Sequence, residues 1–307
     1  MKIYIGVTDR NWLEYLAALQ PDEVNFWRPG GLRGFQVLQP GEPFLFKLHA
    51  PLNYIAGGGF FVRHTALPVS IAWEAFGAKN GAPSHEVLAN MIKQHRNECV
   101  PDPIIGCSIL TQPFFLPQDQ WIPAPADFAK NVVQGKGYCT EEYSGALLWE
   151  QVRERLLTLT TPDSLRIVSE GQSPRYGNEF LTRARLGQGA FRVLVTDAYQ
   201  RRCCITGERT LPVLEASHIR PFANNGPNLV TNGLLLRSDL HTLYDRGYIT
   251  ATTDYHIEVS RRIREEFENG RDYYKLHGNK LVNLPHAKQD RPAADFLAWH
   301  NEHVYVA

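Results

Sequence analysis

The sequence predicts an α+β protein of two domains joined by a helical linker. Before about residue 143, short apolar runs typical of β-strands alternate with glycine- and proline-containing turns and a few helical patterns. After about residue 181, a helical stretch is followed by a strand, a loop, a second strand and a helix. The polar, proline-containing segment between them is typical of a linker. We therefore expect domains at 1–143 and 181–307 and a linker at 144–180.

The composition indicates a globular protein. Of the 307 residues, 43% are hydrophobic and 21% are charged, which is ordinary for such a protein. No apolar run approaches the ~18 residues that cross a bilayer. The first residues, Met1–Val7, follow a strand pattern and lack the apolar core and cleavage site of a signal peptide. We expect a cytoplasmic location and no membrane partner.

The N-terminal domain is expected to form a small, partly closed β-barrel or curved sheet with helices packed on it. The expected strands are Lys2–Val7, Glu23–Trp27, Phe35–Leu38, Pro43–Leu48, Tyr54–Val62 and Pro103–Phe115. The expected helices are Asn11–Leu19, Val69–Phe76 and Ser84–His95. Glycines at 30–31 and 57–59 mark turns or bulges between or within these elements.

Charge is balanced over the whole chain but not locally. The formal net charge of +0 excludes a protein that binds nucleic acid through a uniformly basic surface. The window from Arg175 to Cys204, however, contains six arginines and no lysine. Because the guanidinium fork suits phosphate oxygens, we predict that Arg183, Arg185 and Arg192 contact nucleic-acid phosphates. The alternative is a solvated helix face.

The cysteines indicate neither disulfides nor zinc. There are five, at irregular spacing, and an odd count argues against a disulfide framework. A structural zinc site needs four nitrogen or sulfur ligands, and no such set can be assembled around Cys204-Ile-Thr-Gly207. We expect no structural zinc, and we expect Cys204 to be a small buried apolar residue.

Residues suited to phosphodiester hydrolysis gather in the C-terminal strands and helix, expected at 213–219, 233–237 and 238–246. That reaction needs a base to activate water and a cation to neutralise developing charge. His218 closes the first strand, and a neutral imidazole is well suited to accept a proton near pH 7. His241 and Asp245 lie one turn apart on the helix, so their side chains share a face and begin a divalent metal site. Oxygen ligands favour Mg²⁺ or Mn²⁺ at such a site.

These residues carry a family resemblance. Ser217-His-Ile-Arg-Pro221, then Asn232, then His241-Thr-Leu-Tyr-Asp-Arg-Gly247 resembles the HNH (ββα-metal) nuclease fold over roughly residues 185–260. The resemblance implies that His218 is the general base, that Asn232 braces the loop and orients the base, and that His241 is a metal ligand.

One position departs from the family pattern. The residue before the base histidine is usually Asp or His and binds the metal, whereas this chain has Ser217. Ser217 could bind through its hydroxyl or a water. Alternatively, Glu215 on the same strand face could contribute the ligand.

The N-terminal domain carries a second resemblance. The motifs at 25–31 (NFWRPGG), 41–47 (GEPFLFK), 55–60 (IAGGGF) and 72–74 (AWE) resemble the PUA superfamily, and within it the EVE and YTH-like domains. The resemblance implies a pocket that holds a flipped, often modified base. Extruding a base costs a few kcal/mol, and aromatic stacking returns about 1–3 kcal/mol per base.

Four residues are predicted to line that pocket. They are Trp27 and Trp73 first, then Tyr54 and Asn25. For each aromatic residue, core packing is the alternative interpretation.

A reader of this kind joined to an HNH nuclease resembles the modification-dependent restriction endonucleases. The resemblance implies an enzyme that flips a 5-hydroxymethylcytosine or 5-methylcytosine out of double-stranded DNA and hydrolyses a nearby phosphodiester bond. It implies one divalent metal ion per HNH site, and, since one site cuts one strand, a homodimer. Two alternatives stay open: a non-catalytic reader with a decayed HNH site, and an HNH nicking enzyme that reads unmodified DNA.

Overall fold

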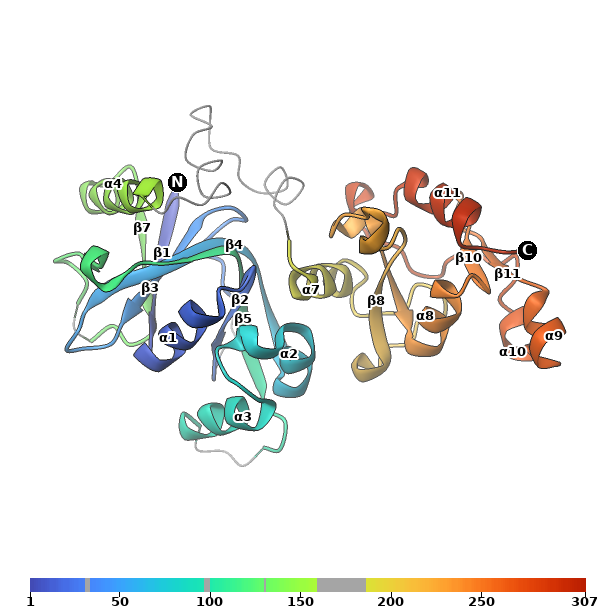
Figure 1. Cartoon of the computed structure of the whole chain (residues 1–307), viewed down its shortest axis with the longest axis horizontal. Helices are drawn as coiled ribbons and strands as arrows, with labels where there is room; N and C mark the ends of the chain where they lie inside the picture. The colour runs from blue at the N-terminus through green and yellow to red at the C-terminus, as the bar shows by residue number, and fades with distance from the viewer. Residues whose placement is uncertain (31–33, 97–99, 130, 159–185) are drawn as a thin grey trace. The chain divides into compact units, whose positions relative to one another are not determined.

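The computed structural model describes residues 1–30, 34–96, 100–129, 131–158 and 186–307. The chain divides into two compact units, Met1–Gly187 and Gln188–Ala307, shown in Figure 1. Residues 144–158 of the predicted linker lie in a helix of the first unit. Residues 159–180 of that linker lie outside the described residues, so its boundaries stay a prediction.

The first unit is built on one seven-stranded sheet. Its hydrogen-bonded order is β2-β5-β4-β3-β1-β7, with β6 paired to β4. The bounds are β1 Lys2–Thr8, β2 Glu23–Arg28, β3 Pro43–Leu48, β4 Tyr54–Pro68, β5 Ile104–Phe115, β6 Ile122–Pro123 and β7 Gly135–Cys139. β1 runs parallel to β3 and antiparallel to β7. The long strand β4 pairs with β3, β5 and β6, and so joins most of the sheet.

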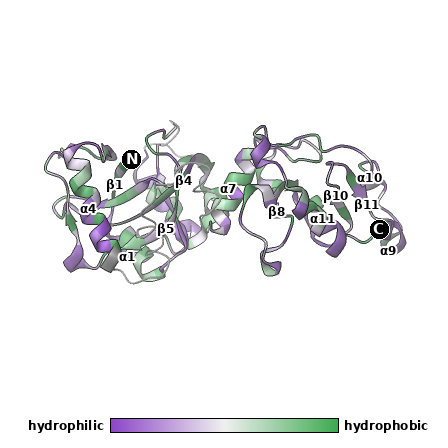
Figure 2. Cartoon of the chain, turned by 90° about the horizontal axis from the view of Figure 1, so that it is seen from above, coloured by the Kyte–Doolittle hydropathy of each residue, from purple (hydrophilic) through white to green (hydrophobic). Residues whose placement is uncertain are grey.

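Alternating side chains give this sheet two apolar faces. On β1, a hydrophobic ribbon in Figure 2, Tyr4 packs into one core cluster while Ile3 and Ile5 pack into another. The first cluster is covered by α1 (Arg10–Leu19) and the second by α4 (Tyr143–Thr158). The amphipathic pattern of α1 buries Trp12, among others, against the sheet.

Two further helices follow β4 in the sequence. They are α2 (Val69–Phe76) and α3 (His85–Gln94), with a 3₁₀ turn at Gly77–Asn80 between them. Ser84 caps α3, because its side chain accepts a hydrogen bond from the Val87 amide at 3.3 Å. The turn ends at Asn80, whose side chain is fully buried.

The second unit is a small α+β fold around an antiparallel pair of strands. Its strands are β8 Leu214–His218, β9 Gly233–Arg237, β10 Ile249–Ala251 and β11 Ile257–Val259. Its helices are α7 Gln188–Ala198, α8 Ser238–Asp245, α9 Arg262–Phe267, α10 Arg271–Tyr274 and α11 Ala294–His303. In the β8–β9 pair, His218 lies opposite Gly233. The core contains Phe191, Tyr199 and Tyr244 together with the fully buried Cys204, the burial expected of that cysteine.

Most expected elements are confirmed, and one strand is wrong. The strands at 43–48 and 233–237 and the helix at 69–76 have the expected bounds. No strand forms over Phe35–Leu38. There the apolar pattern serves tertiary packing, because the Phe35 ring lies 4.9 Å from the Tyr4 ring and 5.4 Å from the Phe61 ring.

The expected mixture of α and β is confirmed, but closure of the barrel is not shown. Within the described residues, the sheet order runs from β2 to β7 without a pairing between those two strands. Among the same residues, every helix is too short or too polar to traverse a lipid bilayer.

Candidate functional site

His218, at the end of β8, is held on two sides. Its ring stacks on that of Phe191, with centroids 3.9 Å apart and planes 12° apart. Its Nε2 lies 2.7 Å from the Oδ1 of Asn228. Since an amide oxygen only accepts hydrogen bonds, Nε2 carries the proton in the neutral ring and Nδ1 is the basic nitrogen.

The surroundings of His218 keep its imidazole neutral. Burial is the largest influence on its pKa and lowers it from the ordinary value. The hydrogen bond to Asn228 and the charge of Asp245 act in the opposite direction but do not outweigh burial. A neutral ring with one basic nitrogen is the form that can accept a proton from water near pH 7.

Asn232 lies at the end of a 3₁₀ turn just before β9 and joins the two ends of the loop between the strands. Its side chain is fully buried. Its Oδ1 accepts from the Arg220 amide at 2.9 Å, and its Nδ2 donates to the carbonyls of Arg220 at 3.0 Å and Pro227 at 2.9 Å. The amide thereby fixes the segment after His218 against the segment that carries Asn228.

His241, on α8, lies between two carboxylates. Its Nδ1 is 2.5 Å from Glu215 Oε2, and its Nε2 is 3.2 Å from Asp245 Oδ2. Burial alone lowers the pKa of His241, but the two carboxylates together outweigh burial and raise it. Charges from both His241 and Asp245 act on His218, so the imidazoles belong to one site.

The chemistry of this donor set fits a divalent cation. With Glu215 accepting the Nδ1 proton, a neutral His241 turns the Nε2 lone pair toward an Asp245 oxygen. In the protonated ring Nε2–H donates to the Asp245 oxygen across 3.2 Å, and in the neutral ring a divalent cation could take the place of that proton. Adjacent ligands at ~2.1 Å from a metal lie about 3 Å from each other, so His241 and Asp245 would hold the ion. Glu215 would orient the imidazole from behind, as carboxylates beside metal-binding histidines do.

Protein ligands would fill only part of the coordination sphere. In the part of the chain that the structure describes, no group of three or more His, Cys, Asp or Glu side chains converges on one metal position. Mg²⁺ is commonly held by one or two protein groups, with water and substrate phosphate completing its shell.

Ser217 is fully buried, and its hydroxyl donates to the His218 carbonyl at 3.4 Å. The carboxylate beside His241 comes from Glu215, two residues earlier on the same strand. The role of Ser217 as a metal ligand stays a prediction.

The sequence pattern does not single out Asn228 or Phe191, since the loop holds several asparagines and no spacing rule distinguishes one of them.

The predicted phosphate contacts are only partly within the described residues. Arg192 lies on α7 and is half-buried. Arg183 and Arg185 lie outside the described residues. All three roles stay predictions.

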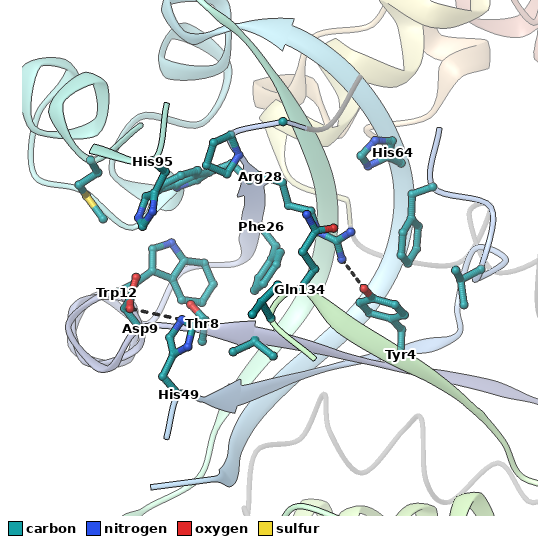
Figure 3. A pocket seen from close by; sticks show the side chains of 18 of the residues that line it. Tyr4, Thr8, Asp9, Trp12, Phe26, Arg28, His49, His64, His95 and Gln134 are labelled. Carbon is teal, nitrogen blue, oxygen red and sulfur yellow. Dashed lines mark hydrogen bonds and ion pairs between the residues drawn. The ribbon is translucent and has the colours of Figure 1, made fainter. Parts of the chain in front are cut away.

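The first unit contains an aromatic cavity of about 860 Å³, shown in Figure 3. Trp27, on β2, lines it together with Trp12, on α1. Both indole Nε1 atoms donate to the Asn80 carbonyl, at 2.9 and 3.0 Å, which fixes the two ring systems relative to each other. Asn25 lies behind this wall, fully buried, and its Nδ2 donates to Asn80 Oδ1 at 2.8 Å.

The other two predicted pocket residues lie outside this cavity. The Trp73 ring, on α2, is 6.3 Å from the ring of His85. The Tyr54 ring, at the start of β4, is 6.1 Å from that of Trp121. Trp12, which lines the cavity, is also a core residue with 4% of its surface exposed.

A protein-family model described as HNH endonuclease matches residues 203–250. The match covers β8, β9 and α8, and therefore His218, Asn232, His241 and Asp245. Residues 203–250 are an HNH nuclease domain. This domain supports a nuclease, and DNA is its expected partner.

Several solved structures align with the chain at low similarity. A point mutant of the ZmASCH protein from Zymomonas mobilis is 10% identical, with 50% of this chain and 99% of that chain covered and a TM-score of 0.32. The modification-dependent TagI restriction endonuclease is 14% identical over 92% of this chain and 75% of its own, with a TM-score of 0.28. The type IV phosphorothioation-dependent restriction endonuclease ScoMcrA is 12% identical over 78% and 48%, with a TM-score of 0.20. A comparison with curated proteins gives no match.

Proposed function

We propose that the protein is a DNA endonuclease that recognises a modified cytosine, 5-hydroxymethylcytosine or 5-methylcytosine, by base flipping. The flipped base enters the aromatic cavity, and the HNH domain hydrolyses a nearby phosphodiester bond with one divalent ion, Mg²⁺ or Mn²⁺. One observation carries the catalytic part: His241 lies between Glu215 and Asp245, in the same site as a neutral His218 held by Asn228.

The catalytic step follows from the fixed imidazole. Nδ1 of His218 takes a proton from a water molecule as the water oxygen attacks phosphorus and the bond from phosphorus to the leaving oxygen breaks. Stacking on Phe191 and the hydrogen bond to Asn228 hold the ring in place for this transfer. His241 and Asp245 would hold a divalent cation, and that cation would neutralise the charge that develops on the phosphate oxygens.

The recognition step follows from the aromatic cavity. Flipping a base costs a few kcal/mol, and stacking on aromatic faces returns about 1–3 kcal/mol per base. Trp12 and Trp27 are already fixed by Asn80 in the unbound protein, so little side-chain entropy is lost when a base enters.

The partner is double-stranded DNA, and the working form is a homodimer. One ββα site cuts one strand, so a double-strand break requires two copies of the HNH domain. The homodimer is tested by measuring the protein's mass in solution with and without modified DNA.

The decisive experiment is cleavage of matched duplexes containing cytosine, 5-methylcytosine or 5-hydroxymethylcytosine, with Mg²⁺, Mn²⁺ or a chelator. We expect metal-dependent cleavage of modified duplexes only. We also expect His218→Ala to abolish cleavage and leave binding intact. Equal cleavage of all three duplexes would instead indicate an enzyme that reads unmodified DNA, and binding without cleavage would indicate a decayed site.

A further inference from the structure

The aromatic cavity has two chemically different ends, which Figure 3 shows in one view. At one end the indole of Trp12 and the neighbouring Trp27 offer apolar faces. At the other end Arg28 lies beside Tyr4 and Phe35. Phe26 lines the cavity as well. A flat base is suited to the first end, so the second end must serve some other part of a ligand.

Arg28 is held rigidly at its end of the cavity. One Nη atom donates to the Tyr4 hydroxyl at 2.6 Å. The guanidinium carbon lies 5.2 Å from the Tyr4 ring centroid and 5.6 Å from that of Phe35, within cation–π range. These contacts fix the direction of the remaining guanidinium donors, so they are preorganised for an acceptor.

The guanidinium lacks an acceptor that matches its charge. Its Nε is buried and has no hydrogen-bond partner among the described residues. Within the same residues, Asp9 is the acidic side chain that lines the cavity, and it lies 3.6 Å from the ring of His49. A buried cationic donor without an acceptor is costly. A ligand oxygen that reaches the part of the guanidinium lining the cavity would supply a charge-matched acceptor that the described residues do not.

The size of the cavity agrees with a ligand larger than a pyrimidine ring. Pockets for drug-sized ligands measure ~300–1,000 Å³, and this cavity of about 860 Å³ lies in the upper part of that range. A methyl group on a base adds little volume and offers no acceptor to Arg28. A hydroxymethyl group, or a sugar attached to it, adds both.

We propose that Arg28 binds an oxygen-bearing substituent on the 5-position of the flipped cytosine, a hydroxymethyl group or a sugar carried on it. The cavity therefore prefers oxygenated cytosines to 5-methylcytosine. This inference rests on the proposed function and narrows its substrate class.

The test is equilibrium binding of the full chain, with chelator present to prevent cleavage. Four matched duplexes are compared, containing cytosine, 5-methylcytosine, 5-hydroxymethylcytosine or glucosylated 5-hydroxymethylcytosine. We expect the wild type to bind the two oxygenated duplexes about tenfold or more tightly than the methylated one, the effect of a charge-assisted hydrogen bond. Arg28→Met, which keeps an unbranched apolar stem, should abolish this tenfold preference. Its affinity for the 5-methylcytosine duplex should stay within about twofold of the wild-type affinity.

Two further variants separate recognition from folding. Tyr4→Phe keeps the ring but removes the hydroxyl that holds the guanidinium, so it should reduce the same preference by a smaller factor. If Arg28→Met fails to fold, the loss of this binding preference in Tyr4→Phe tests the proposal instead. Arg10→Met is the matched control, because Arg10 is an exposed arginine on α1 that pairs with Glu14 outside the cavity. It should leave all four affinities unchanged.

Each other outcome has a definite meaning. Equal affinity for methylated and oxygenated duplexes, both above unmodified DNA, would overturn the role of Arg28 and leave the proposed function standing. An equal loss on all four duplexes in Arg28→Met would place Arg28 on a backbone phosphate and also overturn it. A wild type that does not distinguish any modified duplex from unmodified DNA would overturn the proposed function itself.

Discussion

The Nε2 atom of His218 donates its proton to Asn228 Oδ1 across 2.7 Å. Asn228 thus determines which ring nitrogen is basic, and it is joined to the His218 end of the loop through Asn232. The base is oriented by a side chain ten residues away in sequence, outside the motif that carries the family resemblance.

Asn228→Ala should reduce cleavage by about 10- to 100-fold, since it frees the imidazole to rotate. The Asn228 hydrogen bond raises the pKa of His218 against the larger lowering effect of burial. Its removal should therefore lower that pKa further and move the acidic limb of the rate profile to lower pH. Single-turnover rates across pH measure both effects. Asn224→Ala is the control, because the described hydrogen bonds of Asn224 use backbone atoms. An unchanged pH profile in Asn228→Ala would contradict the positioning role.

Asn232→Ala should destabilise the HNH domain. The substitution leaves the Arg220 amide and two carbonyls without their buried partner, at a cost of ~1–3 kcal/mol for each unsatisfied group that water cannot reach. Thermal unfolding should begin several degrees lower in the variant, by about 2–4 °C per kcal/mol. Asn232→Asp keeps the acceptor for the Arg220 amide and should lose less. Equal unfolding temperatures for wild type and Asn232→Ala would show that the loop is held by other contacts.

Glu215→Gln and Asp245→Asn should both weaken divalent metal binding, for different reasons. Asp245→Asn removes a charged ligand. Glu215→Gln removes the carboxylate that orients His241 from behind, a change that typically costs about 10- to 100-fold in metal affinity. Titration of the protein with Mn²⁺, followed by electron paramagnetic resonance, measures this without any cleavage assay. Asp239→Asn, on the same helix but paired with Arg237, should bind Mn²⁺ like the wild type. Normal Mn²⁺ affinity in Glu215→Gln would refute the orienting role.

The stability of the protein should decrease as the pH falls, because of His300. Its Nδ1 and Nε2 face Thr250 Oγ1 at 2.8 Å and the Tyr244 carbonyl at 3.2 Å, and burial lowers its pKa to about 4. An unfolded histidine titrates near 6.5, so between these values the unfolded state binds more protons. The stabilisation is fully present above about 6.5 and is lost as pH falls through that window, by on the order of 3 kcal/mol. Chemical denaturation at several pH values should show this slope. His300→Gln should flatten it, and His303→Gln, on the exposed side of α11, should not.

The HNH domain could be predicted from the sequence because its chemistry is local in the chain. Strand alternation, the interval to Asn232 and the helical repeat from His241 to Asp245 together define the ββα order from sequence alone. Asn228 could not be predicted in this way. Its role depends on how an irregular loop returns to His218, and loop geometry follows no simple periodicity.

The cavity was harder to predict, since its walls come from segments far apart in the sequence. Trp27 lines it, whereas Trp73 and Tyr54, also predicted to line the pocket, lie elsewhere. Arg28 and Phe35 gain their significance only when β2 and the segment after it meet Tyr4 on β1. Strand pairing of this kind is not encoded in any short pattern.

The position of β1 also has a consequence for synthesis on the ribosome. β1 is made first, yet its antiparallel neighbour β7 begins at Gly135, which at ~5–20 residues per second emerges on the order of ten seconds later. Until then, one edge of β1 lacks its partner, and Ile3 and Ile5 lack α4, the helix that covers their face. A chain truncated before residue 135 would keep that unpaired apolar edge permanently and be prone to aggregate.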